Sequence, residues 1–485
     1  MINTLSMGNQ LSIAVVGTGY VGLVTGVCFS ELGFRVICLD KDKAKIEAIK
    51  QGKIPIHELT LTELLLKNVE QNRLHFDTHL PLAIEACDII IIAVGTPTHP
   101  TTGKADLRFV TEVAEELAPQ LNQHKIIVVK STVPVGTGHR IKKIILNKNP
   151  KAQFTMVSNP EFLREGSAVF DFMNPDRIIV GSECAKARQC MNTLYNSFAQ
   201  QGIPIIHSNI ETAEMIKYAA NCFLANKIAF VNEIASLCEV LNADVENVML
   251  GMGFDKRIGS GYLKPGPGYG GSCFPKDTLA LHHAAAEVKA PLKIIEAVIN
   301  SNQQRKLAMI DKIISACNGE VAGKTLAILG VAFKANTDDV RDSAALTIIQ
   351  GLHAAGAILK IFDPIAMDNA AKVMNHLPLI WADDIYQAIL DTEAVVIVTE
   401  WTEFANLDLK RVKKLMKAGT SRSNNRDHNR KGMSHSDSSE LPAPLLIDLR
   451  NLYLPREVTE VGITYISIGR PPAIPQLENL QNYTE

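Results

Sequence analysis

A glycine- and proline-rich segment from Gly261 to Asp277 carries the side chain best suited to covalent chemistry. Its five glycines and three prolines in 17 residues exclude a helix or strand interior and predict a rigid loop of exposed backbone N–H groups, suited to phosphate or sugar oxygens. Cys273 lies where the next helix should begin, near Lys276, and both features favour a thiolate. Asp277 follows four residues later on the same helix face. We therefore predict that Cys273 is a nucleophile.

The other eight cysteines lie mostly within predicted strands and helices. An isolated cysteine is usually a small buried hydrophobic residue, and we assign them to that role. His75 and His79, and the pair His282 and His283, lack a third ligand at metal-site spacing, so no metal site is predicted.

Two further pairs of polar residues are spaced four apart. Lys217 and Asn221 share one face of a predicted long helix within an apolar run, where a lysine is more often a packed stem than a catalyst. Glu161 and Glu165, in N-P-E-F-L-R-E-G, could divide the roles of base and ligand or form an ordinary surface pair. The spacing alone leaves both alternatives open for each pair.

The segment Gly17-Thr-Gly19-Tyr20-Val21-Gly22 follows a predicted strand and begins a predicted helix. In such a turn the first glycine permits the bend, the second admits a pyrophosphate, and the third lets helix and strand pack closely. The phosphates then lie at the helix N-terminus, whose N–H groups and dipole favour anions. This pattern predicts a dinucleotide site.

Asp40 ends the next predicted strand, 18 residues after Gly22. A carboxylate there accepts hydrogen bonds from ribose hydroxyls and repels a 2′-phosphate, which favours NAD over NADP. Lys41 and Lys45 lie close by and could instead attract a 2′-phosphate, so NADP stays open on these residues alone.

The elements that must position these residues alternate short β-branched runs with helical periodicity, as parallel βαβ units do. The sequence predicts strands at 11–16, 34–39, 88–94, 125–129 and 177–180, and again at 324–333, 358–362, 394–398 and 445–447. Between the two sets, the stretch from Glu211 keeps a helical apolar stripe for over thirty residues without Gly or Pro, and helices at 278–287 and 291–314 follow.

We therefore predict an α/β protein in which two doubly wound Rossmann-like domains are joined by a helical domain with a long central helix. The expected domains are 1–209, 210–318 and 319–485. Residues 419–440 are almost entirely polar or charged, cannot form a core, and are expected to be a flexible insert.

Composition narrows the class of protein. The 485 residues contain 49 Lys and Arg and 51 Asp and Glu, a net charge of −2 that argues against a nucleic-acid or membrane-coating protein. The nine cysteines form no CxxC pair, no signal peptide is evident, and the most apolar early stretch, Ile13 to Phe29, is too short for a membrane span. We expect a cytoplasmic protein with neither a nucleic-acid nor a membrane partner.

Five motifs together resemble the UDP-glucose/GDP-mannose dehydrogenase family. They are G-x-G-Y-V-G, V-G-T-P-T at 94–98, K-S-T-V-P at 130–134, N-P-E-F-L-x-E-G at 159–166 and G-Y-G-G-S-C-F-P-K-D at 268–277. The likeness runs from about residue 11 to 470 and spares 419–440. It implies an NAD-binding, a helical and a UDP-sugar-binding domain, a nucleotide-sugar substrate, and a homodimer or higher homo-oligomer built on the long helix.

The resemblance also implies a four-electron oxidation of UDP-glucose at C6 to UDP-glucuronate, with two NAD and one water. Cys273 would capture the intermediate aldehyde as a thiohemiacetal, which becomes a thioester and is hydrolysed. Lys217 and Asn221 would stabilise the developing oxyanion, and Asp277, Thr132 and Glu161 would handle protons and the hydrolytic water. The first base stays open among Lys217, Asp277 and a water bound to Glu161.

The same resemblance assigns the binding residues. The cofactor site would comprise Gly17, Gly19, Tyr20, Val21, Gly22, Asp40, Lys45, Thr96, Thr132, Glu165, Lys276 and Arg341. The substrate site would comprise Glu161, Phe162, Leu163, Arg164, Glu165, Lys217, Asn221, Arg257, Tyr262, Leu263, Lys264, Pro265, Gly266, Gly270 and Lys334, with Arg257 reaching across the dimer. Without the family motifs, Arg341 and Lys334 would be read as ordinary surface charges.

Other functions are alternatives to the oxidation of UDP-glucose. GDP-mannose or a UDP-N-acetylhexosamine could replace the substrate, although G-Y-G-G-S-C-F-P-K-D and F-D-K-R-I-G favour UDP-glucose. A non-catalytic nucleotide-sugar binding protein would not need Cys273, Lys217, Asn221 and Asp277, all of which are present. A simple alcohol or hydroxyacid dehydrogenase would have no use for the cysteine loop and would yield one NADH per substrate.

Overall fold

The computed structural model describes residues 11–417 and 444–475, which form two compact units. The first unit comprises Met1–Cys222 and Lys276–Leu292, and the second comprises Phe223–Pro275 and Lys293–Glu485. The chain crosses between the units three times: within the helices α10 (Ile210–Leu241) and α12 (Phe274–Glu287), and again between Leu292 and Lys293. The three domain ranges expected from the sequence stay a prediction, and the insert expected at 419–440 lies outside the described residues.

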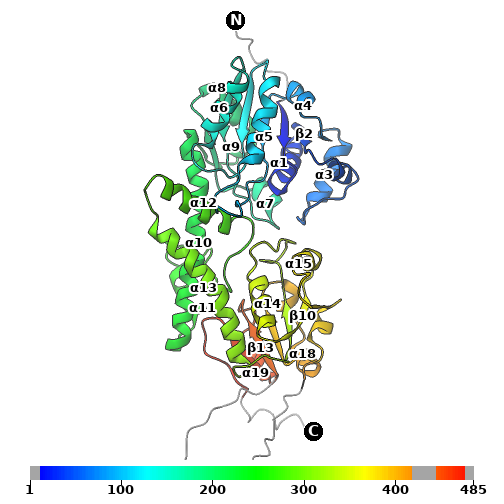
Figure 1. Cartoon of the computed structure of the whole chain (residues 1–485), viewed down its shortest axis with the longest axis vertical. Helices are drawn as coiled ribbons and strands as arrows, with labels where there is room; N and C mark the ends of the chain where they lie inside the picture. Colours follow the sequence, from blue (N-terminus) through cyan, green and yellow to red (C-terminus); the bar gives the residue numbers. More distant parts are fainter. Residues whose placement is uncertain (1–10, 418–443, 476–485) are drawn as a thin grey trace, which may run out of the picture. The chain divides into compact units, whose positions relative to one another are not determined.

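The first unit is built on an eight-stranded sheet with helices on both faces (Figure 1). Its order is β3-β2-β1-β4-β5-β6-β7-β8, and neighbouring strands pair in parallel except β6 and β7. The strands are β1 (Ser12–Val16), β2 (Arg35–Leu39), β3 (Leu74–Asp77), β4 (Ile89–Ile92), β5 (Lys125–Val129), β6 (Phe154–Ser158), β7 (Ile178–Gly181) and β8 (Ile205–Ser208). The order reverses between β1 and β4, where α/β sheets bind ligands.

Alternating side chains of β1 build a core on each face of this sheet. Ile13 and Val15 pack with one set of helices, whereas Ala14 and Val16 pack with the other. The first set is α1 (Tyr20–Glu31), α2 (Lys43–Lys50), α3 (Leu61–Glu70), α7 (Ala168–Met173), α8 (Ala185–Leu194) and α9 (Asn196–Gln200). The second set is α4 (Leu80–Ala86), α5 (Arg108–Leu117) and α6 (Thr137–Lys148).

The second unit contains a six-stranded parallel sheet of order β11-β10-β9-β12-β13-β14. Its strands are β9 (Thr325–Leu329), β10 (Ile358–Phe362), β11 (Ile380–Trp381), β12 (Ala394–Ile397), β13 (Leu445–Asp448) and β14 (Thr464–Ser467). Counted along the chain, this repeats the order of the first six strands of the other unit. Its helices are α11 (Val245–Gly253), α13 (Lys293–Ala316), α14 (Ala344–Ala354), α15 (Met367–Val373), α16 (Ile385–Ile389), α17 (Thr402–Ala405), α18 (Leu409–Leu415) and α19 (Pro455–Glu460).

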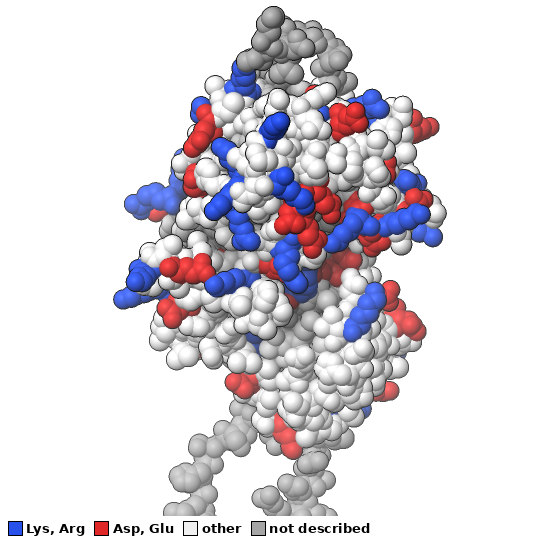
Figure 2. All heavy atoms as spheres, turned by 45° about the horizontal axis from the view of Figure 1, so that its top comes forward, with Lys and Arg blue, Asp and Glu red and all other residues white. Residues whose placement is uncertain are grey.

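The predicted fold class is confirmed: two Rossmann-like sheets are separated in sequence by a helical region that contains the 32-residue helix α10. Details differ from the expectation. Helix α12 begins at Phe274, directly after Cys273, as expected for the segment around the cysteine but earlier than the helix expected at 278–287. Strands β3, β6, β8, β11 and β14 were not predicted. In the described part of the chain, no helix is both long and apolar enough to cross a bilayer. On the face displayed in Figure 2, basic and acidic side chains are interspersed.

Candidate active site

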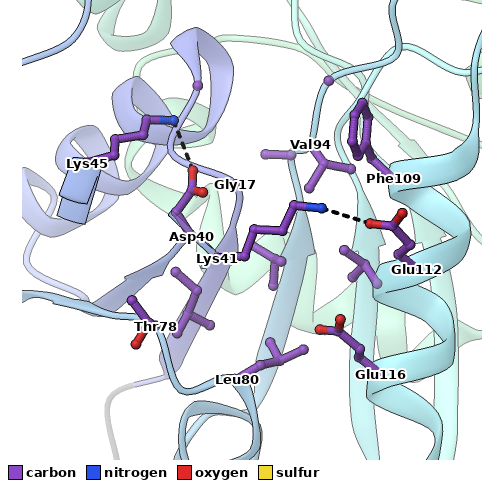
Figure 3. Close-up of a pocket in the computed structure, with 16 residues that line it drawn as sticks. Gly17, Asp40, Lys41, Lys45, Thr78, Leu80, Val94, Phe109, Glu112 and Glu116 are labelled. Carbon is purple, nitrogen blue, oxygen red and sulfur yellow. Dashed lines mark hydrogen bonds and ion pairs between the residues drawn. The ribbon is translucent and has the colours of Figure 1, made fainter. Parts of the chain in front are cut away.

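A cavity of about 280 Å³ opens at the carboxyl ends of β1 and β4, where the strand order of the first sheet reverses (Figure 3). It is lined by Gly17 and Gly19 of the turn after β1, Asp40 at the end of β2, and Val94 and Phe109 on the opposite side. This is the position at which doubly wound sheets bind dinucleotides.

The three glycines of the turn lie in three different steric environments. Gly17 has φ +104°, and a Cβ there would lie 2.7 Å from the carbonyl oxygen of Ala93. A Cβ on Gly22 would lie 1.9 Å from the carbonyl oxygen of Gly17, so only glycine lets α1 pack this closely. Gly19 faces open space, with no atom within 4 Å of its Cβ position, and it precedes α1 without a side-chain cap or an acidic residue in the first turn. The N-terminus of α1 is therefore open to a phosphate group.

Asp40 is held as a carboxylate at the edge of this cavity. Its Oδ2 accepts hydrogen bonds from the Thr18 backbone N at 3.1 Å, Thr18 Oγ1 at 2.7 Å and Lys45 Nζ at 2.9 Å. Partial burial acts to raise its pKa, but the hydrogen bonds from Lys45, Thr18 and the Asp42 amide outweigh it and lower the pKa to about 2.

Both lysines that could attract the 2′-phosphate of NADP form ion pairs with carboxylates. Lys45 pairs with Asp40, and Lys41 pairs with Glu112 at 2.9 Å across the mouth of the cavity (Figure 3). A 2′-phosphate would meet the Asp40 carboxylate, and it would have to compete for both ammonium groups. The geometry therefore favours a free ribose hydroxyl, as in NAD.

Tyr20 connects the glycine turn to the N-P-E-F-L-R-E-G segment. Its hydroxyl hydrogen-bonds the carboxylate of Glu58, and the backbone N–H of Gly166 donates to Glu58 Oε2 at 2.8 Å and to Tyr20 Oη at 2.5 Å. Burial, together with Glu58, raises the pKa of Tyr20, so the hydroxyl stays protonated. Glu58 was missed because it lies in a loop, where only this distant contact gives the carboxylate its role.

The loops that follow β4, β5 and β6 are tied to one another. Thr96 Oγ1 donates to the carbonyl oxygen of Thr132 at 2.8 Å, and Ser131 Oγ donates to that of Val94 at 2.7 Å. Lys130 Nζ donates to Asn159 Oδ1 at 3.1 Å. Burial lowers the pKa of Lys130 to about 8, with Glu161 opposing and Lys217 reinforcing that shift. A second buried lysine thus lies close to the Glu161 and Lys217 pair.

Helix α10 brings two predicted catalytic residues to two predicted carboxylates. Lys217 Nζ lies 3.1 Å from Glu161 Oε1, with both side chains at most 5% exposed. One turn later, Asn221 Nδ2 donates to Asp277 Oδ2 at 2.6 Å, and Asp277 is fully buried. Lys276 also pairs with Asp277. Spacing of four on α10 therefore gives one cation and one amide, each with a buried acidic partner.

The glycine- and proline-rich loop before Cys273 is rigidly held within the second unit. Asn302 of α13 accepts from the Tyr269 N–H at 2.8 Å and donates to its carbonyl at 3.0 Å. Asn232 of α10 accepts from the Gly266 N–H at 2.8 Å, and Arg305 Nε donates to the Gly266 carbonyl at 2.9 Å. Asn232, Asn302 and Arg305 were not predicted, because helix periodicity does not reveal which loop a polar side chain will meet. Cys273 is partly buried at the end of this loop.

Several predicted binding residues have local partners. Arg257 pairs with Asp255 at 2.6 Å, and Arg341 pairs with Asp339 at 2.7 Å, each two residues earlier in the chain. Lys334 lies over the Phe333 ring, with Nζ 5.6 Å from its centroid. The predicted roles of these three residues toward substrate and cofactor stay predictions.

The remaining predicted residues lie on two segments. Phe162, Leu163 and Arg164 follow Glu161 in the first unit, where Arg164 pairs with Asp171 at 2.6 Å. In the second unit, the Tyr262 ring packs edge-on against Phe274 with centroids 6.0 Å apart, and Gly271 N donates to the Arg341 carbonyl at 2.8 Å. Among residues 11–417 and 444–475, no group of three or more His, Cys, Asp or Glu could hold a metal ion.

The glycine turn, the open helix N-terminus and Asp40 define a dinucleotide-dependent oxidoreductase. Comparison with known proteins gives the particular family. Family profiles for the NAD-binding, central and UDP-binding domains of the UDP-glucose/GDP-mannose dehydrogenases match residues 11–199, 211–304 and 327–423. The chain belongs to the UDP-glucose/GDP-mannose dehydrogenase family.

Known relatives match along almost the whole chain. The UDP-glucose 6-dehydrogenase of Rhizobium meliloti is 46% identical over 463 residues, covering 95% of this chain and 100% of that protein. UDP-glucose 6-dehydrogenase TuaD of Bacillus subtilis is also 46% identical, over 460 residues, covering 95% and 93%. A solved UDP-glucose dehydrogenase from Pyrobaculum islandicum superposes with a TM-score of 0.79 at 36% identity, covering 84% of this chain and 94% of that one.

Proposed function

We propose that this protein is a UDP-glucose 6-dehydrogenase in which Cys273 carries the sugar between two NAD-dependent oxidations. One observation carries the mechanism: α10 holds Lys217 against Glu161 and Asn221 against Asp277, and Asp277 lies in the first turn of the helix that begins directly after Cys273. The match with UDP-glucose 6-dehydrogenases, at 46% identity over 95% of the chain, supports the substrate.

The reaction removes four electrons from the C6 carbon of the sugar. NAD supplies the hydride acceptor for each of the two oxidations. In the first, a base of the site takes the C6 hydroxyl proton and the alcohol becomes an aldehyde. The Cys273 sulfur then adds to the aldehyde carbon, and protonation of the oxygen gives a thiohemiacetal. Loss of the second hydride and of the hydroxyl proton leaves a thioester, which water cleaves to the carboxylate and the free thiol.

Lys217 and Asn221 suit the oxygen that becomes negative during these steps. Both are buried, both donate hydrogen bonds, and both are fixed by a carboxylate before substrate arrives. Donors that are already oriented in a water-poor site stabilise an oxyanion most strongly. We propose Glu161 and Thr132 as the groups that position the hydrolytic water, and we propose that the first base is Lys217, Asp277 or a water on Glu161.

We propose that the cofactor binds at the cavity of the first unit. We propose that Gly17, Gly19 and Gly22 receive the pyrophosphate at the N-terminus of α1 and that Asp40 binds the ribose hydroxyls. The nucleotide sugar would be bound through the loop 261–266 and Arg257, which lie in the family's central domain, and through Lys334, which lies in its UDP-binding domain.

Stoichiometry tests this proposal. With purified protein, excess NAD and limiting UDP-glucose, we expect two NADH for each sugar consumed, followed by absorbance at 340 nm to exhaustion. Parallel reactions with GDP-mannose and UDP-N-acetylglucosamine should be at least about ten-fold slower, because leaving one buried polar group of the site unpaired costs about 1–3 kcal/mol. One NADH per sugar would exclude the four-electron mechanism, and faster turnover of another nucleotide sugar would change the substrate.

We propose further that α10 forms a homodimer. In the second unit its surface carries large exposed apolar side chains at intervals of seven residues, Phe223, Phe230 and Leu237, followed by Val240 and Leu241. Seven residues are close to two helical turns, so the three lie along one stripe. An apolar stripe of this length on a monomer is a typical protein interface. Packing against a second copy of the chain would remove this apolar stripe from water.

A charge placed in the middle of the stripe should dissociate the dimer. Phe230→Glu puts a carboxylate at an interface position, and burial of an unpaired charge costs several kcal/mol. We expect light scattering after gel filtration to change from the mass of two chains to the mass of one. Val373→Glu, at an exposed apolar position on α15, is the control and should leave the mass unchanged. A dimer that survives Phe230→Glu would place the interface elsewhere.

A further inference from the structure

Glu214 is a buried carboxylate that none of the proposed chemical steps uses. It is 3% exposed and lies on α10 one turn before Lys217 and two turns before Asn221. Residues spaced by three and seven share a helix face, so the face that presents the two proposed oxyanion donors also presents this acid. Such a group needs a structural or functional partner, because an isolated buried carboxylate is costly.

The partner of Glu214 is the N-terminus of α6. Oε2 accepts a hydrogen bond from the Gly136 N–H at 2.6 Å, and Oε1 accepts one from the Gly138 N–H at 2.8 Å. The first amides of a helix lack intrahelical acceptors and are usually satisfied by a capping side chain. Gly136, the residue before α6, has no side chain, and the first turn of α6 contains no acidic residue. Glu214 therefore supplies from another helix the cap that α6 lacks.

Close packing fixes the same junction. Gly138 lies against the first turn of α10, where an added Cβ would be 2.6 Å from Ile210 Cγ2 and 3.4 Å from Glu214 Oε1. Any larger residue would push α6 away from α10 and lengthen both hydrogen bonds. The N-terminus of α6 therefore has little freedom to move while Glu214 holds it.

This junction ends the loop that carries Thr132. The loop runs from Lys130, after β5, to Gly136, before α6, and its first half is tied to the neighbouring loop through Ser131 and the Thr132 carbonyl. Its second half is held by Glu214. We infer that Glu214 is a positioning residue, whose carboxylate fixes the loop that carries Thr132 for the reaction. The inference rests on the role proposed above for Thr132.

The charge of Glu214 depends on pH in the neutral range. Burial raises its pKa to about 7, opposed by the hydrogen bonds from Gly138 and Gly136 and by His139, and reinforced by Glu211. His139 of α6 and Glu211 of α10 face it and pair with each other at 2.7 Å, and Tyr218 of α10 also interacts with its charge. Above pH 7 the carboxylate accepts hydrogen bonds from both backbone amides. Below pH 7 the protonated oxygen is a poor acceptor, so one amide is released.

Glu214→Gln tests the inference, because glutamine resembles the protonated acid in shape and acceptor number. We expect kcat with UDP-glucose and NAD to fall about ten-fold at pH 8.5, with KM little changed, and to converge on the wild-type value near pH 6. Hydrogen exchange at pH 8.5 should show faster exchange of the amides at 136–138. The control is Glu211→Gln, which removes an exposed carboxylate of the same helix and should change kcat less than two-fold at either pH.

Thermal stability separates positioning from general damage. A raised folded pKa means that the folded protein binds the proton more tightly than the unfolded chain, so Glu214 contributes stability at low pH that is lost as pH rises through about 7. Glu214→Gln should therefore not lower Tm at pH 8.5. If the variant is insoluble, Glu214→Asp keeps the charge with a shorter reach and should lower kcat while the dependence on pH persists.

Two results would overturn the inference. One is a Glu214→Gln variant with wild-type kcat at pH 8.5 and unchanged amide exchange. The other is a loss of kcat by the same factor at every pH, which would indicate a structural role without the carboxylate. If wild-type protein fails to oxidise UDP-glucose, the proposed function fails instead, and the amide exchange still decides whether Glu214 holds the loop.

Discussion

Cys273→Ser is expected to leave the enzyme unable to complete the second oxidation, with turnover to the acid reduced by at least about 10³-fold. A serine hydroxyl is almost fully protonated near neutral pH and is a much weaker nucleophile than a cysteine sulfur. The rigid loop that ends at Cys273 does not depend on the sulfur, because Asn232, Asn302 and Arg305 hold it through backbone groups. The variant should therefore fold and still bind the nucleotide sugar.

Matched cysteine variants make this experiment specific. Cys184 is also partly buried and also precedes a helix, α8, and a hydrogen bond from the Ala187 backbone lowers its pKa. Cys184→Ser should retain full turnover with two NADH per sugar. Mass spectrometry of wild-type protein quenched during turnover should find the sugar attached to the peptide that contains residue 273. Two NADH per sugar from Cys273→Ser at wild-type rate would show that no covalent step is needed.

The dinucleotide site could be predicted from sequence because its determinants are local. The turn from Gly17 to Gly22 is one continuous segment, in which Gly17 is required by its close approach to the Ala93 carbonyl and Gly22 by its close approach to the Gly17 carbonyl. Asp40 ends the next strand, and parallel pairing of β1 with β2 brings it beside the turn. The ambiguity left by Lys41 and Lys45 could not be resolved in this way, because Lys41 meets Glu112 from α5, far along the chain.

The supports of the catalytic residues could not be predicted, because they are contacts between distant segments. Glu58 meets Tyr20 and Gly166, and Glu214 meets the start of α6, yet neither acid stands in a motif. A buried carboxylate looks like a surface one in sequence until the fold shows what surrounds it. The contact between Lys130 and Asn159 could not be predicted either, because Asn159 lies on the loop that follows the next strand.

The strands that were not predicted from the sequence are short and of mixed polarity. β3, with sequence L-H-F-D, and β8, with I-I-H-S, each have four residues, and β8 is partly exposed along its length. Their pairing comes from the neighbouring strand rather than from their own propensity, which is a weak signal over four residues. The helix expected at 278–287 starts too late, although the cysteine was correctly placed at a helix start, because Pro275 was assigned to the loop and proline is favoured in the first turn of a helix.

Lys217→Met should reduce kcat by about 10³-fold, close to the loss produced by removing one oxyanion donor from an enzyme. The substitution removes the cation from a buried ion pair. The Glu161 side chain, which is 5% exposed, then loses its positively charged partner. Loss of one partner from a buried pair costs about 3–5 kcal/mol, so the free energy of unfolding should fall by a similar amount. Both quantities can be measured on one preparation, by NADH formation and by urea unfolding.

A second pair of variants separates the two effects of Lys217. Lys217→Arg keeps the positive charge against Glu161 but cannot place a single ammonium at the oxyanion, so it should recover much of the stability and little of kcat. Lys227 lies on the same helix, and its ammonium donates to the Ile258 and Gly259 carbonyls, so Lys227→Met should leave kcat nearly unchanged. If Lys217→Arg restores kcat and stability together, Lys217 acts mainly by holding Glu161, and Asn221 must then supply the oxyanion contact alone.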